Sequence, residues 1–86
     1  MSLANAQIRE LYEKEYPGLF RIACASGLGR DFADDMVQET FQTLLEKRDN
    51  PKIAGHTNLK GWLITTLRNK IASEMQRRWR HMEQPL

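Results

Sequence analysis

The chain has 86 residues, of which 41% are hydrophobic, and it carries a net charge of +2. A chain of this length buries one core but not two, so we expect a single small domain. The single cysteine excludes a disulfide framework, and no apolar stretch approaches the ~20 residues that a membrane-spanning helix needs. Because no signal peptide precedes the domain, we expect the protein in a reducing cytoplasm.

The composition predicts an all-α fold, a small bundle of about four helices. The sequence has few β-branched runs and no alternation of apolar and polar residues with period two, so no sheet is expected. The first two helices are predicted over residues 3–15 and 17–26, with Pro17 in the first turn of the second. Glycines at positions 27 and 29 end that helix, because glycine tolerates the left-handed backbone that closes a helix.

A third helix is predicted from a cap at Asp31 to a last turn that contains Lys47 and Arg48. The polar segment 49–57 is predicted to be a loop, and Thr57 or Asn58 caps a fourth helix that runs to about Met82. The last residues are expected to fray. The following apolar side chains are expected to share one core: Phe20, Val37, Phe41, Leu44, Leu63, Leu67 and Ile71. Leu45 is assigned to the core face of the third helix as well.

The third helix is acidic. Between Asp31 and Glu46 there are five carboxylates and no lysine or arginine. The glycine-containing turn before it is compatible with a helix-turn-helix motif, but an acidic helix would be repelled by the phosphates that flank the major groove. Its outward face favours a basic protein partner, the alternative being a merely solvated surface.

The fourth helix has a polar face that is basic and partly aromatic. A step of ~100° per residue places one set of side chains on this face: Trp62, Thr66, Asn69, Ser73, Arg77 and Arg80. The opposite, apolar side carries Leu63, Ile64, Leu67, Ile71 and Met75. Residues 60–86 have a net charge of +4, whereas residues 1–59 have a net charge of −2. This mixture suits phosphates and unstacked bases, although a neighbouring loop that covers Trp62 and a solvated helix end would explain it too.

No pattern in the sequence indicates catalysis, a metal or a cofactor. Cys24 lies in an apolar run and is expected to be a small buried side chain. His56 and His81 have no cysteine or carboxylate at the spacing of metal ligands. No nucleophile–base pair or phosphate-binding glycine loop is present, so we expect a protein that is not an enzyme.

Two motifs give the chain a specific resemblance. The run from Ala33 to Phe41, Ala-Asp-Asp-Met-Val-Gln-Glu-Thr-Phe, resembles the Ala-acid-Asp-x-x-Gln-Glu-x-Phe signature of bacterial sigma factors. Trp62-Leu63 followed by Leu67-Arg68-Asn69 is similar to the Trp-Leu-x-x-x-x-Arg-Asn signature that follows it. With the upstream run Leu-Tyr-x-x-x-Tyr-x-x-Leu-Phe from Leu11 to Phe20, the resemblance covers about residues 8–80. It is greatest to region 2 of the extracytoplasmic-function sigma factors.

The resemblance implies a transcription initiation factor with two binding surfaces. Region 2 of such factors binds the clamp helices of the RNA polymerase β′ subunit and captures the non-template strand of the promoter minus-ten element. By position in the motifs, the polymerase-binding residues would be Asp35, Gln38, Glu39 and Gln42. The DNA-binding residues would be His56, Asn58, Lys60, Trp62, Asn69, Arg77, Arg78 and Arg80. Loop residues such as His56 and Asn58 would line a pocket for a flipped base, and an anti-sigma factor is a further partner that the resemblance allows.

The chain departs from the family pattern in three respects. Ser73 stands where the family usually has aspartate, and Gln76 where it commonly has arginine, which puts the local geometry of the basic side chains in doubt. Thr65 and Thr66 replace paired aromatics of the housekeeping factors, which implies weaker strand opening. The second domain, region 4, is not expected in these 86 residues, so the chain is either an excised domain or a truncated protein. The first three residues, Met-Ser-Leu, are a candidate for a partial expression scar.

Two other functions use the same surfaces. A helical protein-interaction module would bind a basic partner through the acidic helix and leave the basic helix end in solvent. An RNA-binding domain would use the basic face and prefer strands with 2′-hydroxyl groups. Binding of single-stranded minus-ten oligonucleotides distinguishes the three hypotheses.

Overall fold

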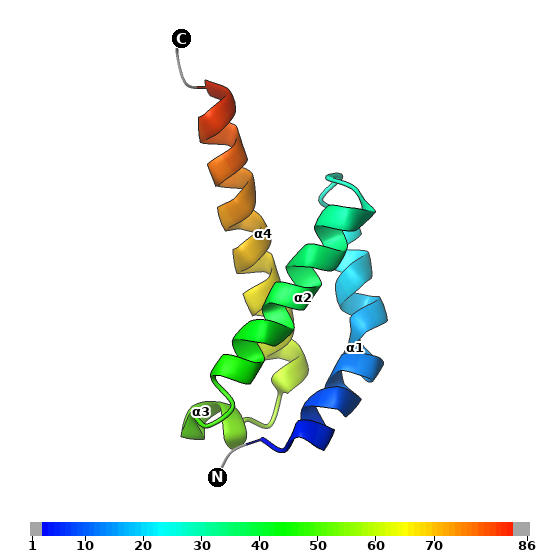
Figure 1. The fold of residues 1–86 in the computed structure, drawn as a ribbon, viewed down its shortest axis with the longest axis vertical. Coiled ribbons are helices and arrows are strands. Elements are labelled where there is room, and N and C mark those ends of the chain that lie inside the picture. The colour runs from blue at the N-terminus through cyan, green and yellow to red at the C-terminus, as the bar shows by residue number, and fades with distance from the viewer. Residues whose placement is uncertain (1–2, 84–86) are drawn as a thin grey trace.

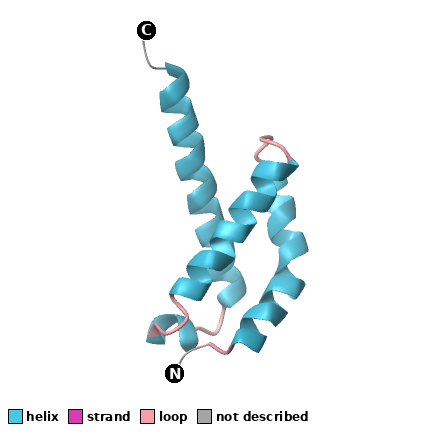
Figure 2. Cartoon of the chain, viewed as in Figure 1, coloured by secondary structure: helices cyan, strands magenta, loops and turns pink. Residues whose placement is uncertain are grey.

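The computed structural model describes residues 3–83, and the side chains of residues 81–83 are not described. The described residues form helices and loops without strands (Figure 2). The helices are α1 (Asn5–Cys24), α2 (Arg30–Glu46), α3 (Pro51–Ala54) and α4 (Leu59–Glu83). The predicted all-α class is therefore confirmed. The expected tail, residues 84–86, and the side chain of His81 lie outside the described part of the chain.

The first two predicted helices are wrong as separate elements, because α1 continues through Pro17. A proline inside a helix removes one hydrogen bond and usually ends or bends the helix. Here an aromatic row crosses the proline on the inner side of α1. Ring centroids are 5.3 Å apart between Tyr12 and Tyr16, and 5.7 Å apart between Tyr16 and Phe20. This packing stabilises the helix on both sides of Pro17.

The glycine turn between α1 and α2 has the conformation that the sequence predicts. Gly27 and Gly29 have φ angles of 80° and 97°, in the region that favours glycine. Gly29 is also the N-cap of α2, so the predicted cap at Asp31 is wrong; Asp31 lies in the first turn, near the positive end of the helix dipole. The helix ends at Glu46, one residue before the two basic residues expected in its last turn.

The predicted loop 49–57 contains the short helix α3, so the prediction of a segment without regular structure is wrong there. Asn50 caps α3 by accepting a hydrogen bond from the backbone of Lys52 at 2.9 Å, and Pro51 occupies the first turn. Ile53 faces the core and is 5% exposed. The cap of α4 was predicted correctly, because the Oδ1 of Asn58 accepts a hydrogen bond from the backbone N–H of Gly61 at 3.0 Å.

The core lies where α1, α2 and α4 meet, and α1 and α2 run antiparallel beside each other (Figure 1). Six of the seven predicted core residues are buried: Val37, Phe41, Leu44, Leu63, Leu67 and Ile71. Phe20 is only partly buried and packs at the edge of this core. The backbone N–H of Leu3 donates to the carbonyl of Arg48 at 3.1 Å, and the Leu3 side chain joins the core.

Two apolar residues assigned to buried faces are exposed. Leu45 is 39% exposed, because it lies about 100° around α2 from Leu44 and beyond the edge of the buried face. Met75 is 41% exposed and lies at an open surface beside Ile22 and Ala25, near the end of α1. The last turns of α4 extend past the α1–α2 hairpin (Figure 1) and carry the arginine-rich segment 77–80, so the arginines lie beyond most of the core.

Candidate nucleic-acid interface

A groove of about 630 Å³ lies between α2 and α4. Helix α4 contributes most of the polar face that the sequence predicts: Trp62, Thr66, Asn69, Ser73 and Arg77. Successive members of this set are three or four residues apart, close to one helical turn of 3.6 residues, so they form one stripe along α4. Arg80 continues this stripe in the sequence but is not part of the groove wall.

Trp62 lies between the core and the groove. Its side chain is half-buried and packs against the core, and it also lines the groove. Farther along the same wall, Asn69 is exposed, so its amide donor and acceptor are accessible from solvent. An aromatic face and an amide about two turns apart are groups that stack on a base and hydrogen-bond to its edge.

The opposite wall of the groove comes from α2 and was missed by the sequence analysis. It consists of Met36, Glu39, Thr43 and Lys47. These positions recur at intervals of three and four residues, which is the spacing of one face of a helix. This helical spacing is visible in the sequence, but only the packing of α2 against α4 shows that this face borders Asn69 and Arg77. Lys70 of α4, also missed, lines the same groove.

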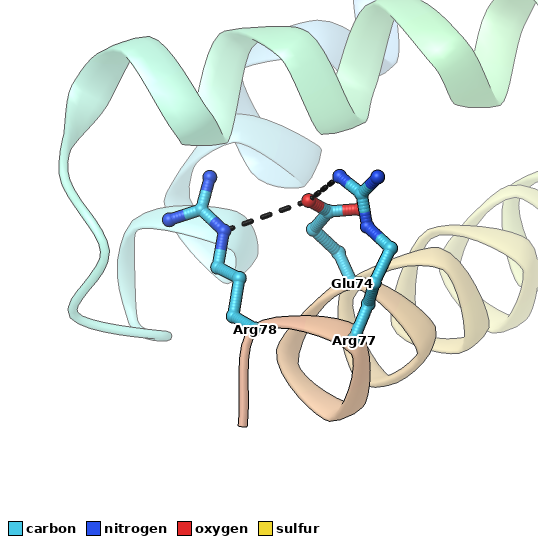
Figure 3. A network of polar contacts seen from close by, with 3 residues as sticks. All are labelled: Glu74, Arg77 and Arg78. Atoms are coloured by element: carbon cyan, nitrogen blue, oxygen red, sulfur yellow. Dashed lines mark hydrogen bonds and ion pairs between the residues drawn. The ribbon is translucent and has the colours of Figure 1, made fainter. Parts of the chain in front are cut away.

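The arginine cluster is organised around Glu74. Its Oε1 atom accepts a short hydrogen bond from Arg77 and lies 3.5 Å from the Nε atom of Arg78 (Figure 3). The hydrogen bond from Arg77 lowers the pKa of the Glu74 carboxyl, because it stabilises the ionised form. A carboxylate that pairs with the basic side chains is thus present one residue after Ser73.

Arg77, Arg78 and Arg80 have different surroundings. The guanidinium of Arg78 also lies over the ring of Phe32 in α2, at 4.7 Å from its centroid. Arg78 follows Ile71 by seven residues and so continues the core-facing side of α4. The Arg77 side chain is 77% exposed, and Arg80 makes no ion pair with any residue in the described range. Arg77 and Arg80 are therefore the more accessible cations of the cluster.

The three predicted DNA-binding residues before Trp62 lie apart from the groove. His56, Asn58 and Lys60 are exposed, and none of them lines the groove wall. The Nδ1 atom of His56 accepts a hydrogen bond from the backbone N–H of Asn58 at 2.9 Å, while the Asn58 side chain caps α4. Both side chains thus organise the α3–α4 connection.

The four predicted polymerase-binding residues form one exposed face of α2: Asp35, Gln38, Glu39 and Gln42. At one edge of this face the Nε2 atom of Gln38 donates to the hydroxyl of Tyr12 and, at 3.4 Å, to Asp34. At the other edge Glu39 lines the groove. Glu39 therefore belongs to the acidic face of α2 and also to the groove that contains the α4 stripe, so the two surfaces are adjacent.

The α1–α2 pair is joined by a polar contact next to this face. The hydroxyl of Tyr16 donates to Asp34 at 2.5 Å, and this hydrogen bond raises the pKa of Tyr16 to about 12. The carboxylate stabilises the protonated phenol and opposes its ionisation. Asp34 is therefore engaged with α1, whereas Asp35 beside it is exposed.

None of the described helices is long and apolar enough to cross a membrane. The sigma-70 region 2 family matches residues 11–81. A curated relative, the ECF RNA polymerase sigma factor EcfG of Rhodopseudomonas palustris (strain TIE-1), is 37% identical over 67 residues. That alignment covers 78% of this chain and 36% of the relative, so the chain spans about a third of its relative's length. No solved structure matches the chain significantly.

The family match includes α2, α4 and most of α1, the three helices that build the core and the groove. It also contains both motifs on which the resemblance rests. The chain therefore belongs to the sigma-70 region 2 family, and its similarity to EcfG supports the extracytoplasmic-function type within that family.

Proposed function

We propose that this domain acts in transcription initiation as a non-catalytic promoter-binding part of RNA polymerase. Membership in the sigma-70 region 2 family supports a role in transcription initiation. In the proposed mechanism, α2 binds the clamp helices of the β′ subunit, and α4 captures the non-template strand of the minus-ten element as the duplex opens. An anti-sigma factor would compete for these surfaces.

The observation that carries the DNA-binding part is the groove between α2 and α4. Trp62, Asn69 and Arg77 line it along α4 and offer an aromatic face, an amide and a cation in that order. A single strand exposes base faces, base edges and phosphates at once, so each of these groups has a counterpart on it. A closed duplex covers the base faces, and we therefore expect the open strand to bind better.

The polymerase-binding part rests on the acidic face of α2. Asp35 and Glu39 are exposed and lie about one helical turn apart. Negative charge on an accessible helix face suits a basic protein surface and repels DNA. The proposal therefore assigns protein and strand to adjacent but oppositely charged surfaces.

Binding to single-stranded minus-ten oligonucleotides tests the strand-capture role. The oligonucleotides are varied at one position at a time, and binding is measured at several salt concentrations for the wild type, Asn69→Ala and Arg80→Ala. An amide aimed at a base edge discriminates by about 1–3 kcal/mol, so Asn69→Ala should flatten the ranking among sequences. A phosphate contact carries no sequence information, so Arg80→Ala should lower all affinities together and reduce the salt dependence.

A wild-type domain that binds none of these oligonucleotides would refute strand capture. It would favour the protein-interaction module, whose acidic helix works without nucleic acid. Stronger binding to RNA of the same sequence would instead favour the RNA-binding alternative, because only RNA presents the 2′-hydroxyl group.

A further inference from the structure

Glu74 is the only carboxylate, among the described residues, that forms an ion pair. It has two such partners, Arg77 and Arg78, on either side of one carboxylate oxygen (Figure 3). These arginines belong to the cluster assigned to phosphate binding under the proposed function. The guanidinium groups of Arg77 and Arg78 are therefore already paired with a carboxylate in the absence of DNA.

We infer that Glu74 is an internal competitor for the phosphates of the bound strand, and that it limits the affinity of the arginine cluster. This inference rests on the proposed strand-capture function. A carboxylate and a phosphate bind a guanidinium through the same donor geometry, so both cannot use the same N–H groups of Arg77 at once. Strand binding then requires Arg77 to exchange one anion for the other.

The exposure of the three side chains supports an exchange of this kind. The Glu74 side chain is only 20% exposed, whereas Arg77 is 77% and Arg78 is 51% exposed. The carboxylate is thus partly covered and held in place, while the guanidinium of Arg77 reaches solvent and can turn towards a phosphate. An exposed ion pair of this kind is weak, which makes the exchange energetically accessible.

The two arginines should respond differently to a strand. Arg78 has a second partner, the ring of Phe32, which holds its guanidinium between α4 and α2. Among the described side chains, Arg77 forms an ion pair and a side-chain hydrogen bond with Glu74 alone, and it also lines the groove. Arg77 is therefore the cation that changes partner, and Glu74 is a residue that sets affinity without contacting a base.

The test is the salt dependence of oligonucleotide binding by Glu74→Gln in the full chain. The amide keeps the size of the side chain but removes its charge. Because the carboxylate no longer repels phosphate, affinity at low salt should rise about threefold to tenfold. In this variant a solvent anion would pair with Arg77 in place of the Glu74 carboxylate. Strand binding would displace that anion and so release about one more ion than in the wild type. The slope of log K against log salt should steepen by about 0.7, and the gain should vanish at high salt.

Glu13→Gln is the matched control. It makes the same change in net charge on α1, at an exposed residue without an ion pair in the described range, and it should leave affinity and slope unchanged within about twofold. Circular dichroism checks that both variants stay folded.

The possible results separate the inference from the proposed function. Unchanged or weaker binding by Glu74→Gln, with a folded domain, would overturn the inference, since Glu74 would then be neutral or would orient the arginines for binding. An equal gain in Glu13→Gln would overturn it as well, because the effect would be one of net charge alone. A wild type that binds no oligonucleotide at any salt concentration would refute the proposed function and the inference with it.

Discussion

Replacing Phe41 by alanine should remove a large part of the stability of this domain, because the side chain is only 4% exposed and lies where α1 packs on α2. Its ring contacts Tyr12 edge-to-face, with centroids 4.9 Å apart. Truncation of a buried phenylalanine costs about 3–5 kcal/mol. At about 0.05–0.15 kcal/mol per residue, a chain of this length has a total stability of about 4–13 kcal/mol. The loss would lower Tm by about 12 °C or more.

Leu45→Ala is the control for this prediction. It lies on the same helix but is 39% exposed, so its truncation should cost less than about 1 kcal/mol. Urea and thermal unfolding followed by far-ultraviolet circular dichroism measure both variants. A cost below about 1 kcal/mol for Phe41→Ala, or equal costs for the two, would refute the assignment of the core face of α2.

Three further predictions concern the surfaces. Charge reversal by Asp35→Lys with Glu39→Lys should abolish co-purification with core RNA polymerase and leave the circular dichroism spectrum unchanged; retained binding would refute the clamp-helix proposal. Trp62→Ala should weaken binding to a single strand more than to a duplex, and equal losses would mean that the indole only supports the core. Because Asp34 raises the pKa of Tyr16 to about 12, folding keeps the phenol protonated. Its stabilisation, about 1 kcal/mol given its partial exposure, should be complete below about pH 10 and lost as pH approaches 12, and Tyr16→Phe should remove this pH dependence of unfolding.

The regular parts of the fold were predictable because each had its own local pattern. The spacing of Val37, Phe41 and Leu44 is that of a helix face, and Gly27 and Gly29 occupy positive φ angles. Pro17 misled the prediction, because a proline fits both the start of a helix and, when neighbouring rings support it, the interior. The aromatic row that decides between them is a packing effect that local propensity does not contain.

At the groove, too, local sequence patterns predicted only the part of the structure that lies within one helix. The stripe that contains Trp62 and Asn69 follows from periodicity along α4, and the structure places it on the wall of the groove. Thr43 and Lys47 were missed because they border this stripe only through the packing of α2 on α4. The contact of Arg78 with Phe32 was equally hidden, since the two residues are distant in sequence. The individual roles in binding remain predictions until the variants are measured.

The close approach of Asn58 to Gly61 fixes the first turn of α4. A Cβ atom added at Gly61 would lie 2.5 Å from the Nδ2 atom of Asn58, so alanine would displace the amide that caps the helix. Farther along, the buried side chains of Leu63, Leu67 and Ile71 hold the rotational phase of α4 against the core. Because each residue is turned by ~100° relative to the one before it, this packing also turns Trp62, Asn69 and Arg77 towards the groove together. A substitution that shifted α4 by one residue along its axis would therefore move all three groups out of the groove at once, without touching any of them.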